Sequence, residues 1–131
     1  MKITADTNVL VRAVVRDDAK QAQAAANALR QASLIAVSLP CLCEFVWVLR
    51  GVYGFEHAAI ASAIRALMAT EKVAMDRPAV EMGLAVLEAG GDFADGIMAQ
   101  QGQWLGAETF VSFDKKAVSS LSRLGQAAQM P

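Results

Sequence analysis

The chain has 131 residues, of which 55% are hydrophobic, and its formal net charge is −1. This length is typical of one domain with one core, so we predict a single domain over residues 1–131. A near-neutral charge excludes a protein that binds nucleic acid by overall electrostatic attraction alone, but not an enzyme that holds phosphate through metal ions.

Short apolar strands alternate with helices along the whole chain. In chain order we expect a strand at 2–5, a short helix from Thr7, a helix over 17–32, a strand at 34–38, a helix from Pro40 to Gly51, a helix over 56–70, a strand at 72–75, a helix from Pro78 to Ala89, a helix over 93–105, a strand at 109–113, a helix over 115–124 and an edge strand in the C-terminal QAAQMP. Continuously apolar strands are typical of a parallel sheet that helices cover on both faces. We therefore predict an α/β protein, a three-layer α/β/α sandwich with a short parallel sheet of four to five strands.

Targeting and membrane segments are not expected. The N-terminal MKITADTN places an acid where a signal peptide needs an apolar core. Ser38, Pro40 and Glu44 interrupt the longest apolar stretch, so no membrane span is predicted. The sequence therefore favours a cytoplasmic protein.

Glu44 is the one polar side chain in the apolar run from Cys41 to Leu49. An isolated ionised carboxylate in an apolar interior is costly, so such a group is neutralised, finds a partner or coordinates a metal. Arg12 and Arg50 are the candidate partners for a buried ion pair, and a metal ion is the other alternative.

Four further acids stand at the ends of predicted elements. Asp6 and Asp114 follow the first and the last clear strand, at the edge where open parallel sheets bind ligands. Asp92 and Asp95 are three residues apart at the start of a helix and share a face. A simpler interpretation applies to Asp6, Asp92 and Asp114, because each can cap the helix that follows it.

Carboxylates gathered at one sheet edge repel one another unless a cation lies among them. The one histidine, His57, is predicted on a helix surface, so neither a histidine-based triad nor a histidine–metal site is available. Oxygen ligands alone suit Mg²⁺ or Mn²⁺. Such a site indicates phosphoryl chemistry, in which the ions clamp phosphate and activate water.

The motifs ADTNVL, CEFVWVL, DFADGIMA and FVSFD occur in this order along the chain. With them, the chain resembles the PIN-domain nucleases over essentially its whole length, and more narrowly the VapC-type toxins of bacterial toxin–antitoxin pairs. One departure is DGIMAQQG, where members of the family often read closer to DALIAA. Gly96 lowers helix propensity just after Asp95 and weakens the predicted helix start.

The resemblance implies a metal-dependent ribonuclease whose metal-bound water attacks the phosphorus of RNA. By motif, the acids that would hold one or two Mg²⁺ or Mn²⁺ ions are Asp6, Glu44, Asp95 and Asp114. Accessory residues beside the metal site would be Asp92, Asn8 and Ser112. The basic residues near the ends of these elements are candidate contacts to the RNA backbone, with solvated surface charge as the alternative: Arg12, Arg16, Lys115 and Lys116.

The resemblance also implies partners. The chain would form a homodimer, and an antitoxin would lay a C-terminal segment across the acidic pocket and block it. The high apolar content agrees with both interfaces, because monomers rarely expose large apolar patches. The implied function is an endoribonuclease that acts as the toxin of a toxin–antitoxin pair.

Three other classes of protein are alternatives to this interpretation. A receiver-type signalling domain needs paired acids after the first strand, where only Asp6 stands, and a phospho-accepting aspartate after a central strand, where Asp76 precedes Arg77-Pro78. A haloacid-dehalogenase-like phosphatase needs a second aspartate at the position of Asn8. A PIN-like module that only binds is the third alternative, and the presence of all four acids favours the enzyme.

Overall fold

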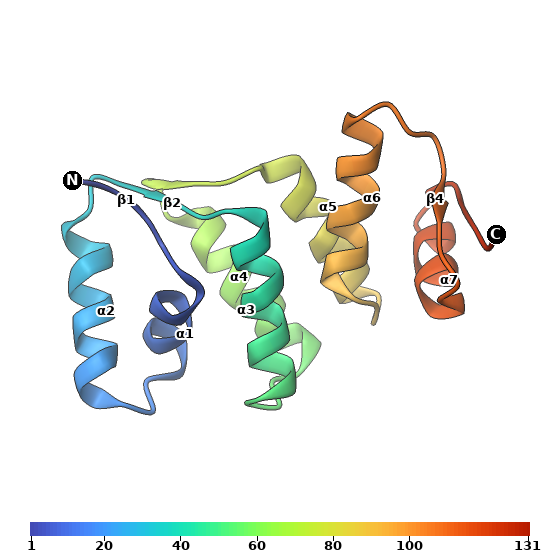
Figure 1. Ribbon diagram of the computed structural model, residues 1–131. Helices are drawn as coiled ribbons and strands as arrows, with labels where there is room; N and C mark the ends of the chain where they lie inside the picture. The colour runs from blue at the N-terminus through green and yellow to red at the C-terminus, as the bar shows by residue number, and fades with distance from the viewer. The chain divides into compact units, whose positions relative to one another are not determined.

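The computed structural model describes residues 1–131, and the chain forms two compact units, Met1–Asp76 and Arg77–Pro131. Each unit combines helices with short strands (Figure 1). Every strand pair is parallel, in one three-stranded and one two-stranded sheet. The predicted PIN-like α/β fold with a short parallel sheet is confirmed. The single domain over residues 1–131 stays a prediction.

The first unit holds the three-stranded sheet, in the order β1-β2-β3. Ile35 in the central strand pairs with Ile3 on one side and with Val73 on the other. The elements of this unit are β1 (Lys2–Thr4), α1 (Thr7–Val15), α2 (Ala19–Gln31), β2 (Leu34–Ala36), α3 (Leu39–Gly51), α4 (His57–Ala69) and β3 (Val73–Ala74). Its core is made of fully buried side chains from three of the helices: Leu10, Leu42, Phe45, Leu49, Ile60 and Ile64.

Local capping explains where several of these helices begin. Asp18, the N-cap of α2, accepts a hydrogen bond from the backbone N–H of Gln21 at 3.0 Å. Ser38 caps α3 through the N–H of Cys41 at 3.3 Å, with Pro40 in the first turn. A side-chain oxygen at this position satisfies an N–H group that has no partner within the helix.

The second unit contains α5 (Arg77–Glu88), α6 (Phe93–Trp104), β4 (Phe110–Val111), α7 (Lys115–Arg123) and β5 (Ala128–Gln129). Phe110 of β4 pairs with Ala128 of β5, so the C-terminal QAAQMP adds the predicted edge strand. Both residues pack on a small core cluster of Val86, Ala99 and Leu121. None of the helices in the chain is long and apolar enough to cross a lipid bilayer.

Gly96 lies at a close approach of α5 and α6. A β-carbon at this position would come within 2.6 Å of the carbonyl oxygen of Met82 and 2.7 Å of the α-carbon of Gly83. The low helix propensity of Gly96 does not prevent α6 from starting at Phe93, where Asp92 is its N-cap. Gly96 therefore lets two helices pack backbone to backbone directly beside Asp95.

Candidate metal centre

Asp6 stands between the carboxyl end of β1 and the start of α1, as the sequence predicts. It occupies the N-cap position, and its backbone carbonyl accepts hydrogen bonds from the N–H groups of Val9 and Leu10. Its side chain makes no capping hydrogen bond and is exposed. The interpretation of Asp6 as a side-chain cap is therefore wrong, and its carboxylate remains available to a ligand.

Glu44 lies at an exposed position of α3, so its carboxylate is not enclosed by the apolar run around it. The helix α3 packs through Leu42, Phe45 and Leu49, which are completely buried, whereas Trp47, one turn beyond Glu44, is 68% exposed. The apolar run from Cys41 to Leu49 therefore includes residues on both the buried face and the exposed face of α3. The sequence alone did not separate the two faces, because both are apolar.

Neither candidate arginine pairs with Glu44. Arg12 forms an ion pair with Asp17 at 2.7 Å, and Arg50 lies 3.9 Å from Glu56. The alternative of a buried arginine–glutamate pair is therefore wrong.

Thr7, which was not among the predicted site residues, holds Glu44. Its hydroxyl donates a hydrogen bond to Oε1 of Glu44 at 2.5 Å. The Thr7 side chain is 4% exposed and lies at the first position of α1, directly after Asp6. A buried hydroxyl needs a partner, and Thr7 finds it in Glu44, 37 residues away, so the motif ADTNVL alone did not single out Thr7.

Cys41 lies beside the same residues. Its Sγ is 3.8 Å from Oγ1 of Thr7. Burial raises the pKa of the Cys41 thiol, the Thr7 hydroxyl lowers it, and the charges of Asp6 and Glu44 raise it. Cys41 therefore stays a neutral thiol and supplies no soft thiolate ligand. We call Asp6, Thr7 and Glu44 the first acidic cluster.

Asp92 and Asp95 lie at the start of α6 in the second unit. Asp92 is the N-cap, and its Oδ1 accepts a hydrogen bond from the N–H of Ala94 at 3.0 Å. Asp95 is in the first turn and half-buried. Burial raises the pKa of Asp95 to about 6, with the charges of Asp92 and Asp114 as further causes. Asp114 therefore lies close enough for its charge to act on Asp95.

Asp114 is the N-cap of α7, where its Oδ1 accepts hydrogen bonds from Lys116 N–H at 2.9 Å and Ala117 N–H at 3.3 Å. Its own N–H donates to Oγ of Ser112 at 3.0 Å, which orders the turn after β4. The capping interpretation is thus right for Asp92 and Asp114. In both residues capping engages Oδ1 and leaves Oδ2 without a protein partner. We call Asp92, Asp95 and Asp114 the second acidic cluster.

The two clusters supply oxygen ligands only. The structure shows no group of three or more histidine, cysteine, aspartate or glutamate side chains that is placed to hold a metal ion. The chemistry of the donors still fits hard divalent cations, because carboxylate and hydroxyl oxygens are what Mg²⁺ prefers and no thiolate or imidazole is present. A single site made by Asp6, Glu44, Asp95 and Asp114 stays a prediction.

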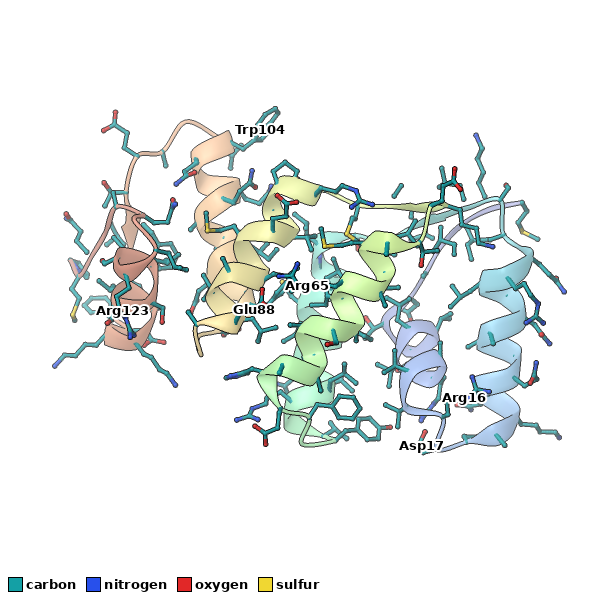
Figure 2. The ribbon with its side chains drawn as sticks, turned by 180° about the vertical axis from the view of Figure 1, so that it is seen from behind. Arg16, Asp17, Arg65, Glu88, Trp104 and Arg123 are labelled. Carbon is teal, nitrogen blue, oxygen red and sulfur yellow. The ribbon has the colours of Figure 1, made fainter.

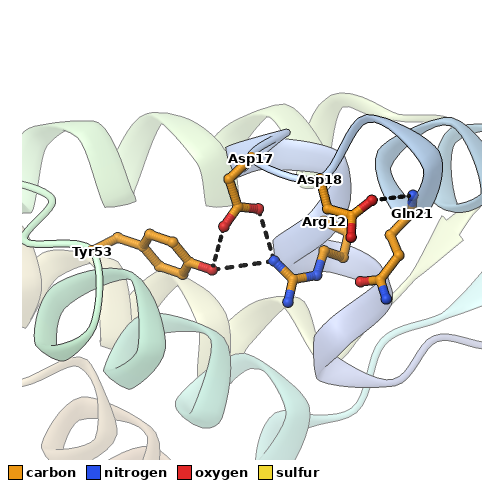
Figure 3. A network of polar contacts seen from close by, with 5 residues as sticks. All are labelled: Arg12, Asp17, Asp18, Gln21 and Tyr53. Carbon is orange, nitrogen blue, oxygen red and sulfur yellow. Dashed lines mark hydrogen bonds and ion pairs between the residues drawn. The ribbon is translucent and has the colours of Figure 1, made fainter.

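Arg12, a predicted RNA contact, is held in a network of side chains (Figure 3). Its Nη1 donates to Oδ1 of Asp17 at 2.7 Å and to the hydroxyl of Tyr53 at 3.3 Å, and the same hydroxyl donates to Oδ2 of Asp17 at 3.1 Å. These contacts raise the pKa of Arg12 and lower that of Asp17, against the effect of desolvation on both. The network joins α1 to the segment after α3.

The other predicted contacts are exposed. Arg16 lies at the end of α1 (Figure 2). Its φ of 59° is a left-handed conformation that favours glycine. Lys115 and Lys116 lie in the first turn of α7, beside Asp114. The positions of these basic residues agree with RNA contact and with solvated surface charge alike, so their role stays a prediction.

Asn8, a predicted accessory residue of the metal site, is exposed in the first turn of α1, and its role also stays a prediction.

The fold is α/β, with acids at strand ends and helix starts and without a set of histidine or cysteine ligands. These features define a class of protein that uses hard divalent ions. The family model of the PIN domain matches residues 3–124, and the chain belongs to this family. PIN domains are generally metal-dependent nucleases that use ions such as Mg²⁺, so membership indicates a nuclease. It also sets aside the receiver and phosphatase alternatives. No curated protein and no solved structure gives a significant match.

Proposed function

We propose that the chain is a cytoplasmic, metal-dependent endoribonuclease and the toxin of a toxin–antitoxin pair. The observation that carries the proposal is that none of Asp6, Glu44, Asp92, Asp95 and Asp114 forms an ion pair, although the chain has 12 lysine and arginine residues. Acids that lie near one another within one unit, without a basic partner, favour a bound cation. Family membership over residues 3–124 supports the same conclusion.

The proposal gives each acid a role. Asp6, Glu44, Asp95 and Asp114 hold Mg²⁺ or Mn²⁺, and Asp92, Asn8 and Ser112 support them. A divalent ion at such a site makes bound water a nucleophile at neutral pH and stabilises charge on phosphate. Asp95 is half-buried beside two other carboxylates, and a bound cation relieves that repulsion. Lys115 and Lys116, at the start of α7, contact the RNA backbone.

Cleavage of RNA tests this function directly. The protein, purified free of partners, is incubated with a panel of tRNA and rRNA fragments in Mg²⁺, in Mn²⁺ and in EDTA, and the products are separated on a denaturing gel. We expect cleavage with a divalent ion and none in EDTA. Asp6→Asn is expected to lower the cleavage rate at least about a hundredfold, because loss of a ligand charge costs more than loss of an outer partner that only orients a ligand.

Two outcomes would contradict the proposal. If the wild type cuts none of the RNAs with either ion, the proposed nuclease function fails. If Asp6→Asn cuts at the wild-type rate, the assignment of the site is wrong.

Exposed apolar side chains support the proposed partners. Trp47 is 68% exposed one turn from Glu44, Trp104 is 80% exposed at the end of α6 (Figure 2), and Phe113 is 81% exposed beside Asp114. Exposed aromatic residues of this kind are typical of protein interfaces. We propose that they serve the homodimer and the antitoxin, whose C-terminal segment covers the acids.

Replacing Glu44 by glutamine separates metal binding from stability. We expect Mn²⁺ affinity to fall about tenfold or more. The free energy of unfolding in EDTA is expected to stay within about 0.5 kcal/mol of wild type, since Glu44 is exposed and the side-chain carbonyl of the new glutamine still accepts the Thr7 hydrogen bond. Calorimetric titration and urea denaturation measure the two quantities.

The matched control for this variant is Glu71→Gln, at an exposed glutamate near the start of β3. It is expected to change neither quantity. A large loss of stability in EDTA for Glu44→Gln would instead assign Glu44 a structural role.

A further inference from the structure

The hydrogen bond between Thr7 and Glu44 joins α1 and α3 across 37 residues of sequence. The donor is buried, at 4% exposure, whereas the acceptor side chain is exposed. The other neighbour of the Thr7 hydroxyl, Sγ of Cys41, is 3.8 Å away, and sulfur is a weak acceptor. The hydroxyl is therefore directed at Oε1 of Glu44.

This hydrogen bond makes the two oxygens of Glu44 unequal. Oε1 accepts the hydrogen bond of the Thr7 hydroxyl, and the carboxylate makes no other hydrogen bond or ion pair with the protein. A free glutamate on a helix surface samples several rotamers, and fixing it otherwise costs conformational entropy. Thr7 therefore holds Glu44 in one arrangement, with Oε2 as the oxygen that remains without a partner.

The number of free oxygens bears on which cation Glu44 accepts. Ca²⁺ takes six to eight oxygens and often binds a carboxylate through both of its oxygens, whereas the smaller Mg²⁺ is held by single carboxylate oxygens and keeps several waters. A hydroxyl on Oε1 competes with a metal for that oxygen. We propose that Thr7 is a positioning residue that limits Glu44 to a one-oxygen interaction and thereby favours Mg²⁺ and Mn²⁺ over Ca²⁺. This inference rests on the proposed metal-dependent function.

Metal titration without RNA tests the proposal. The affinities for Mg²⁺ and for Ca²⁺ are measured by calorimetry on the wild type, on the isosteric Thr7→Val and on Thr7→Ser. We expect Thr7→Val to bind Mg²⁺ about tenfold more weakly, because Glu44 loses the partner that orients it. The affinity for Ca²⁺ is expected to be retained or raised. The ratio of Ca²⁺ to Mg²⁺ affinity therefore rises about tenfold. Thr7→Ser, which keeps the hydroxyl, is expected to restore the wild-type ratio within about twofold.

The control is Thr4→Val, the same change at an exposed position of β1, which is expected to leave both affinities unchanged. If Thr7→Val weakens both ions equally, or neither, the ratio is unaltered and the positioning role is overturned. If the wild type binds no Mg²⁺, the proposed function fails and this inference with it. If Thr7→Val does not fold, as judged by circular dichroism, Thr7→Ala replaces it with the same expected ratio.

Discussion

Replacing Asp95 by asparagine is expected to abolish RNA cleavage and, at the same time, to stabilise the metal-free protein above pH 6. The cleavage rate should fall at least about a hundredfold, because the proposed metal site loses a ligand charge. The gain in stability has a different cause. Asp95 is half-buried beside two like charges, and its asparagine replacement does not ionise.

The sign of the pH dependence follows from the direction of the shift. The pKa of Asp95 is about 6 in the folded protein, against 3.8 for the unfolded chain, so the folded state binds the proton more tightly. The contribution of protonated Asp95 to stability is complete below pH 3.8 and is lost as the pH rises through 6. By linkage this pKa shift corresponds to a change of about 3 kcal/mol in the free energy of unfolding. Solvent screening at a half-exposed site reduces the expected effect to about 1–2 kcal/mol.

Urea denaturation in EDTA at pH 3.8 and at pH 8 measures this effect. We expect wild type and Asp95→Asn to differ little at the lower pH, and the variant to be more stable by about 1–2 kcal/mol at pH 8. Glu108→Gln, at an exposed acid of the same unit, is the control and should show no such change. A difference between wild type and Asp95→Asn that does not depend on pH would show that Asp95 ionises normally.

Most elements of the fold were predictable from the sequence because their start signals are local. Ser38 with Pro40, Asp18 and Asp92 each cap a helix close to its predicted beginning. The alternation of apolar strands with helices likewise indicated parallel pairing, which every strand pair shows. These capping signals act within four residues of sequence, and the structure contains the helix starts that they predict.

The surroundings of the acids were less predictable, because they depend on contacts between distant residues. The helix α3 is apolar on both faces, so its sequence did not reveal that Glu44 and Trp47 lie on the exposed face. Thr7 gained its role only through Glu44, 37 residues away. The half-burial of Asp95 similarly depends on how α6 packs. Sequence motifs located the acids, whereas tertiary packing decides their exposure and partners.

Gly96→Ala is expected to destabilise the protein, although alanine is the better helix former. The new β-carbon would lie 2.6 Å from the carbonyl oxygen of Met82, and 2.7 Å and 2.9 Å from Cα and N of Gly83. These are backbone atoms, so α5 and α6 must move apart to relieve the overlap. Overpacking of this kind costs about 1–3 kcal/mol or more, against a gain in helix propensity of about 1 kcal/mol. Because the overlapped atoms belong to the backbone, the upper part of this range applies: a cost of about 2–3 kcal/mol less a gain of about 1 kcal/mol gives an expected net loss of about 1–2 kcal/mol in the free energy of unfolding.

The position of Gly96 links this packing to the candidate site, because Asp95 precedes it on α6. A shift of α6 displaces Asp95, and displacements of about 1 Å at a reacting centre cost about a hundredfold in rate.

Gly102→Ala on the same helix is the matched control, since its β-carbon meets nothing nearer than the Ala107 β-carbon at 3.9 Å. Urea denaturation should show that this control is as stable as wild type or more so. If Gly96→Ala is stabilised in the same way, α5 and α6 are not in backbone contact at Gly96, and the glycine in DFADG has no packing role. If it is destabilised and cleaves slowly while Gly102→Ala does neither, the close approach of the two helices is what places Asp95.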